Sequence, residues 1–176
     1  MQSIANILFF KGVWFGSLFG AGTGRPWLGL VLLCAFAAWH FAHSRHREAD
    51  LWLLGAAALT GLLLDTLFLQ LGVLDYAHPL PSSQLAPFWI VVMWMNFALT
   101  LNLSMRWLQG RYLLSAALGL IGGPLAYIAG VELGAADWGM RTVNALVVIG
   151  IAWALAVPLL SGFAHRMVLR AASVPA

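Results

Sequence analysis

Six long apolar segments dominate this sequence of 176 residues and leave little of the chain outside them. They cover about residues 4–22, 26–43, 51–73, 85–105, 112–131 and 142–164. A hydrocarbon core of about 30 Å requires roughly 20 apolar residues per helix, so each segment is suited to cross a membrane. Lipid offers no partners to backbone polar groups, which favours helices. We therefore predict an all-α, polytopic membrane protein. Its single domain, residues 1–176, is a compact bundle of six transmembrane helices.

The composition agrees with this class and excludes another. Hydrophobic residues make up 62% of the chain and charged residues 9%, whereas soluble domains have about 45–50% and about 25%. Nine Lys and Arg residues give a net charge of +3. They are too few for a surface that follows nucleic-acid phosphates. The sequence therefore predicts the lipid bilayer as partner and excludes nucleic acid.

The distribution of arginines predicts the orientation. Those after the second and fourth segments, with those of the C-terminal tail, are Arg45, Arg47, Arg106, Arg111, Arg166 and Arg170. The opposite side holds only Arg25 and Arg141. Because cytoplasmic loops carry the excess of Lys and Arg, we expect both termini to be cytoplasmic.

Glycines at intervals of four form smooth stripes on two predicted helices. The first segment contains Gly12, Gly16 and Gly20, and the fifth contains Gly119 and Gly123. Small residues let helix backbones approach closely in membranes. Each stripe is either a packing face inside the bundle or a docking face for another membrane protein.

Two charged residues lie inside apolar segments, where a charge is costly and marks a candidate functional site. Asp65 is a structural hydrogen-bonding group, a proton carrier or a counter-ion for a ligand. Lys11 either extends toward Asp65 or snorkels to the cytoplasmic surface.

The fourth segment carries a polar stripe in "MWMNFALTLNLSMRWL", residues 93–108. On a helical wheel Asn96, Thr100 and Ser104 share one face, which Trp89 and Met93 continue outward. Asn102 falls elsewhere, and the pattern predicts no role for it. The stripe predicts either helix–helix hydrogen bonds or the wall of a ligand cavity.

The second alternative leads to a specific site. We expect a polar-lined cavity between the third, fourth and fifth spans, open to the outer side. The proline-rich loop 75–87 is either a lid over this cavity or a stiff connector. Its predicted ligand-binding residues are Asp65, Trp89, Met93, Asn96, Thr100, Tyr127 and Glu132. The function favoured by this pattern is binding or transport of a small or lipid-like ligand.

Catalytic and metal signatures are missing from the sequence. It contains no GxSxG, P-loop, HExxH or dinucleotide-binding turn. His40, His43 and His46 have the spacing of one histidine box, but a di-iron site needs several boxes. We therefore predict no catalytic residue, no cofactor and no metal, and expect these histidines to contact lipid headgroups or water.

Three stretches together resemble a known family. "GLLLD", "PFWIVVMWMNFALTLNLSMRWL" and "GLIGGPLAYIAGVELGA" are similar to a small bacterial inner-membrane family known as domain of unknown function 2878. The resemblance implies a multi-pass protein of the bacterial cytoplasmic membrane and brings no established activity. Its members are often encoded near lipid-modifying enzymes, which implies an alternative role as an accessory protein or enzyme of membrane-lipid modification.

The predicted architecture is also similar to the substrate-binding subunits of energy-coupling-factor vitamin transporters. Those are compact six-helix proteins that meet a partner through a small-residue stripe on the first helix. By this likeness the stripe Gly12, Gly16 and Gly20 implies a third alternative, a membrane scaffold that docks a partner.

Overall fold

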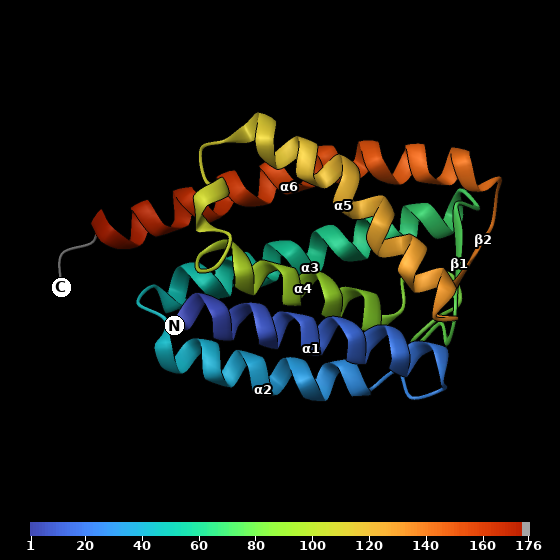
Figure 1. The fold of residues 1–176 in the computed structure, drawn as a ribbon, viewed down its shortest axis with the longest axis horizontal. Coiled ribbons are helices and arrows are strands. Elements are labelled where there is room, and N and C mark those ends of the chain that lie inside the picture. The colour runs from blue at the N-terminus through green and yellow to red at the C-terminus, as the bar shows by residue number, and fades with distance from the viewer. Residues whose placement is uncertain (174–176) are drawn as a thin grey trace.

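The computed structural model describes residues 1–173, in which six α-helices form one bundle. The helices are α1 (Gln2–Gly22), α2 (Leu28–His43), α3 (Arg47–Gln70), α4 (Phe88–Leu101), α5 (Tyr112–Glu132) and α6 (Thr142–Ser173). Successive helices alternate in direction, so the first turn of α1 and the last turn of α6 lie at the same end of the bundle (Figure 1). We call this the terminal end. The predicted all-α fold is confirmed.

Four helices in the described part of the chain are long and apolar enough to cross a membrane: α1, α3, α5 and α6. Shorter apolar helices, α2 with 16 residues and α4 with 14, complete the bundle. A length of 14 residues corresponds to only about 21 Å of helix. The α-helix is shorter than the predicted span of about 85–105, because only Phe88–Leu101 is α-helical. Turns and the short 3₁₀-helix η1 (Arg106–Leu108) follow it.

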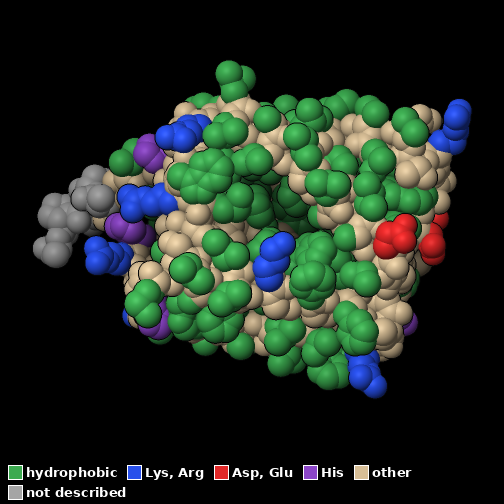
Figure 2. Space-filling view, viewed as in Figure 1, with side chains coloured by type: hydrophobic (Ala, Val, Ile, Leu, Met, Phe, Trp, Pro, Cys, Tyr) green, Lys and Arg blue, Asp and Glu red, His purple; other side chains and the backbone are tan. Residues whose placement is uncertain are grey.

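Large apolar side chains cover the outside of the helices. Leu113, Val143 and Leu159 are 90%, 69% and 72% exposed, a pattern that suits lipid and not water. On the face shown in Figure 2, most Lys, Arg and His side chains lie at the terminal end, and Asp and Glu side chains lie at the opposite end. The chain is thus a multi-pass membrane protein.

A short antiparallel ribbon, which the sequence did not predict, joins the loops that follow α3 and α5. Strand β1 (Leu74–Tyr76) pairs with β2 (Ala136–Trp138), with Tyr76 opposite Ala136. Side chains alternate along β1, so Asp75 is exposed while Leu74 and Tyr76 are buried. The ribbon thereby directs Tyr76 into the end of the bundle.

Glycines mark the closest helix contacts. Gly119 and Gly123 on α5 lie against Trp153 of α6, where an added Cβ would clash. Gly16 and Gly20 of α1 lie in the same way against α2 and the turn before it, whereas Gly12 has open space around its Cα. Four of the five predicted stripe glycines therefore lie against other parts of the same chain.

Candidate functional site

A buried carboxylate holds four elements of the fold together. Asp65, in α3, is fully buried, and its Oδ1 accepts hydrogen bonds from the Tyr76 hydroxyl at 2.6 Å and the Tyr127 hydroxyl at 2.5 Å. Its Oδ2 accepts a hydrogen bond from Trp94 Nε1 at 2.7 Å. We call these four residues the Asp65 cage. It links α3, β1, α5 and α4 through one side chain.

The cage supplies hydrogen-bond donors to a carboxyl group that lies in an apolar interior. A buried polar group destabilises a fold unless hydrogen bonds replace those lost from water, and both oxygens of Asp65 have donors. Within residues 1–173 no cation forms an ion pair with Asp65. The alternative that paired it with Lys11 is not what the structure shows: Lys11 is exposed, and its Nζ lies 5.7 Å from the Trp14 ring centroid.

Tyr76 lies on the ribbon, outside the spanning helices, and its environment keeps it a donor. Burial, with the negative charge of Asp65 added, raises the pKa of the Tyr76 phenol well above its ordinary value. The hydroxyl therefore retains its proton and donates it in the hydrogen bond to Asp65.

Beside the cage lies a cavity of about 300 Å³, at the lower end of the range of about 300–1,000 Å³ for small-molecule pockets. It is bounded by α1, α4, α5 and α6. Its lining residues include Trp14, Trp89, Met93, Gly122, Tyr127 and Trp153. Tyr76, Trp94 and Tyr127 belong both to the wall and to the cage. Asp65 therefore lies behind the wall, bonded to the side chains that form it.

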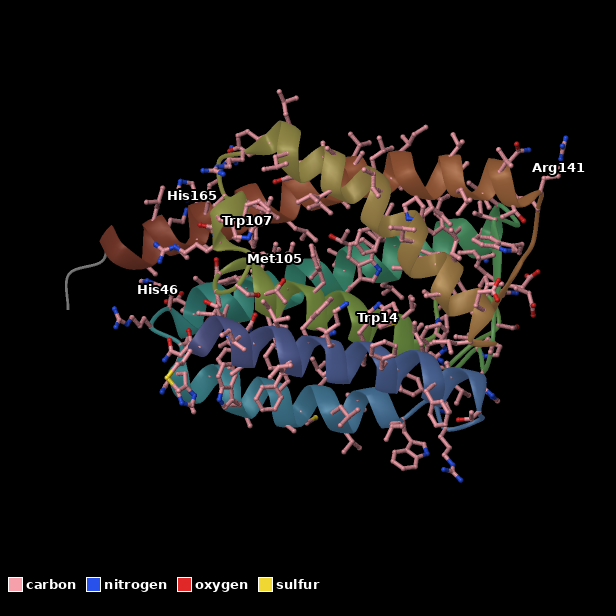
Figure 3. The ribbon with its side chains drawn as sticks, viewed as in Figure 1. Trp14, His46, Met105, Trp107, Arg141 and His165 are labelled. Carbon is pink, nitrogen blue, oxygen red and sulfur yellow. The ribbon has the colours of Figure 1, made fainter. Side chains whose placement is uncertain are left out.

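The cavity opens sideways between α1 and α5. These helices meet where Leu18 lies against Gly130, and they diverge toward the terminal end (Figure 1). Figure 2 shows a hollow near the centre of this face, lined by hydrophobic side chains and with a Lys or Arg side chain at its edge. In Figure 3, Trp14 on α1 and Met105 beyond α4 border the same space. The opening therefore faces the lipid-exposed side of the bundle and not either of its ends.

The structure places only some of the predicted ligand-binding residues at the cavity. Trp89, Met93 and Tyr127 line the cavity, whereas Glu132 is exposed at the end of α5. The cavity differs from the predicted one in three respects: its opening, its lining and the helices that form it. It opens sideways between α1 and α5 instead of toward the outer side. Its lining is mainly apolar and aromatic, and α3 contributes none of the lining residues while α1 and α6 do.

The polar stripe of the fourth segment faces α1 instead of the cavity. Asn96 Nδ2 donates to the carbonyl of Phe10 at 3.0 Å, and the Thr100 hydroxyl donates to the carbonyl of Phe97 at 2.6 Å. Ser104 lies beyond the helix, where its hydroxyl donates to Asn6 Oδ1 at 2.5 Å. Asn96 and Ser104 thus bond to α1, as the helix–helix alternative predicts, whereas Thr100 bonds to the backbone of its own helix.

Three residues of the site are not among the ligand-binding residues predicted from the sequence: Tyr76, Trp94 and Trp153. Trp94 and Trp153 stack with ring centroids 4.4 Å apart. Their positions deep within apolar segments were the available signal, because most other tryptophans lie near segment ends. No signal pointed to Tyr76, since its place depends on the ribbon.

A family model described as protein of unknown function (DUF2878) matches residues 3–159. The chain belongs to this family. The DUF2878 match includes every residue of the Asp65 cage and agrees with the resemblance carried by the three sequence stretches. No curated protein and no solved structure matches the chain. Evidence about its function therefore comes from the cavity and the cage.

Proposed function

We propose that this DUF2878 protein binds a lipid-like ligand, with an apolar chain or ring, in the cavity between α1, α4, α5 and α6. The observation that carries the proposal is the apolar, aromatic wall combined with an opening toward lipid. Apolar pockets with few polar groups are the usual form of small-molecule sites. A lateral opening lets a ligand enter directly from the bilayer. We place the protein in the bacterial cytoplasmic membrane with both termini cytoplasmic.

The chemistry of the wall supports an apolar ligand. The hydroxyls of Tyr76 and Tyr127 and the indole N–H of Trp94 all donate to Asp65. These donors are therefore engaged before any ligand arrives. A molecule that moves from lipid into the cavity gains little hydrophobic free energy, because lipid chains are as apolar as the wall. Selectivity then depends on shape and on contact with rigid aromatic rings.

The Asp65 cage is proposed to act as a positioning device. Tyr127 and Trp94 are fixed by their hydrogen bonds to Asp65, and Trp153 stacks on Trp94. Rings held in place before binding lose little conformational freedom when a ligand arrives. Asp65 thus supports the shape of the cavity without lining it.

Gly122 allows a direct test. It lines the cavity, and a Cβ added there meets no atom within 4 Å. Gly122→Leu should therefore place an apolar side chain at the cavity and obstruct it, with a Cβ that displaces no neighbour. Gly55→Leu is the matched control, because Gly55 on α3 also has no atom within 4 Å of an added Cβ and does not line the cavity.

The probe is phosphatidylglycerol with a diazirine on one acyl chain, incorporated into vesicles with the purified protein. After irradiation we expect crosslinks to peptides that contain Trp14 or Met93 in the wild type and in Gly55→Leu. These crosslinks should be lost in Gly122→Leu. Equal labelling of Gly122→Leu and the wild type at these peptides would overturn the proposal.

A further inference from the structure

A second cavity, of about 230 Å³, lies at the terminal end of the bundle. It is formed by the end of α2, the start of α3 and the segment that follows α4. Its lining residues include Arg45, Arg106, His43 and His46, and it shares no lining residue with the apolar cavity. Its chemistry is therefore independent of the proposed lipid-like ligand.

A buried hydrogen-bond network builds one wall of this cavity. Asp50 accepts hydrogen bonds from three side chains: His40 Nε2 at 3.0 Å, the Ser44 hydroxyl at 2.5 Å and Asn102 Nδ2 at 2.7 Å. Asp50 and His40 are 4% and 3% exposed. The only acidic residue that lines the cavity is thus occupied by donors from its own chain.

The same network fixes the backbone segments that carry the arginines. His46 N donates to the Ser44 hydroxyl at 3.1 Å, which fixes the turn containing Arg45. Asn102 accepts a hydrogen bond from Gln109 at 2.8 Å, which closes the segment containing Arg106. Two arginines from separate loops are therefore held at one cavity by contacts that do not involve their guanidinium groups.

The guanidinium groups at the cavity are free to donate. Arg45 and Arg106 are exposed, and neither guanidinium forms a hydrogen bond or ion pair with the residues that the structure describes. The His43 ring is held by a hydrogen bond in which Nδ1 donates to the Trp39 carbonyl at 2.8 Å, because a carbonyl oxygen can only accept. The planar guanidinium group matches phosphate oxygens in pairs, with charge-assisted hydrogen bonds.

We propose that this cavity binds a phosphate group through Arg45 and Arg106. The phosphate comes either from a phospholipid headgroup or from a soluble phosphate ester. The volume of about 230 Å³, equivalent to about eight waters at roughly 30 Å³ each, accommodates the phosphate together with the first part of the group that it esterifies. Asp50 keeps its negative charge, which its three hydrogen-bond donors partly offset and which the two guanidinium charges exceed.

The test compares the double variant Arg45→Gln/Arg106→Gln with Arg111→Gln. Arg111 is an exposed arginine near Arg106 in the sequence that does not line the cavity, so it controls for a change in general surface charge. In one arm, equilibrium dialysis measures binding of radiolabelled glycerol 3-phosphate to the detergent-solubilised protein. In the other, native mass spectrometry measures phosphatidic acid retained by protein released from vesicles.

We expect the wild type to bind in at least one arm. The affinity should fall tenfold or more in the double variant, since each charge-assisted hydrogen bond is worth about tenfold or more in affinity. In Arg111→Gln the affinity should stay within about twofold of wild type. Loss in the lipid arm alone assigns a headgroup site, and loss in the soluble arm alone assigns a soluble ester. No binding in either arm, or equal losses in the double variant and the control, would overturn the proposal. Gly122→Leu should leave this binding unchanged, which separates it from the proposed function.

Discussion

Replacing Tyr127 with Phe removes one hydroxyl from the Asp65 cage and leaves the aromatic ring in place. The hydroxyl donates to Asp65 Oδ1 over 2.5 Å, and both residues are buried. Hydrogen bonds to charged groups contribute about 1.5–3 kcal/mol to stability, whereas side-chain hydrogen bonds between transmembrane helices average about 0.6 kcal/mol. Because Asp65 has no cation partner within residues 1–173, its donors are the groups that stabilise it. We therefore expect Tyr127→Phe to lower the free energy of unfolding by about 1.5–3 kcal/mol.

The assay is reversible unfolding in mixed micelles with increasing sodium dodecyl sulfate, followed by circular dichroism. Tyr112→Phe is the matched control, because Tyr112 is 53% exposed and lies outside the cage. Its free energy of unfolding should change by no more than about 0.5 kcal/mol. The effect of Tyr127→Phe should also largely disappear in an Asp65→Asn background, as a double-mutant cycle would report. A loss of about 0.6 kcal/mol or less for Tyr127→Phe would refute the interpretation that Asp65 is charged and stabilised by its hydrogen-bond donors.

Three further predictions concern the ribbon, the terminal end and the orientation. The folded state holds the pKa of Tyr76 above its unfolded value of about 10, so the contribution of the protonated phenol to stability is complete below pH 10 and is lost as pH rises. Above pH 10 the free energy of unfolding should therefore fall by up to about 1.4 kcal/mol per pH unit. The fall should be smaller in Tyr76→Phe, which has no phenol to titrate. Asn102→Ala removes a donor to Asp50 and should lower the unfolding free energy by about 1–3 kcal/mol in the same micelle assay; no change would mean that this network does not fix the segment. In a cysteine-free background, a membrane-impermeant maleimide should label Ser83→Cys and spare Glu48→Cys in spheroplasts, and the reverse pattern would invert the orientation.

The number of helices could be predicted from the sequence because it depends on a local property. A run of about 20 apolar residues suits the bilayer thickness whatever its neighbours are. The end of α4 could not be predicted in this way. Asn102 bonds to Asp50, 52 residues away, and Ser104 bonds to Asn6, 98 residues away. These tertiary partners stabilise a chain that leaves the helix after Leu101, whereas a helical wheel assumes that the helix continues.

The candidate site was predictable only in part, for a similar reason. Asp65 stood out because a charge within an apolar segment is costly wherever it lies. Its donors come from β1, α4 and α5, and no sequence spacing relates them. The cavity also depends on tertiary structure, because it lies where α1 and α5 diverge and is lined from four helices. The search for polar lining residues favoured Asn96, which instead bonds to α1.

The central claim, a lipid-like ligand in the lateral cavity, is tested most directly by an experimental density map of protein purified with its native lipids. For the wild type we predict elongated density between α1 and α5 that reaches Trp14, Met93 and Tyr127. The same region of a Gly122→Leu map should contain only the leucine side chain. A wild-type map in which side chains close the cavity, or in which it holds no density, would contradict the account.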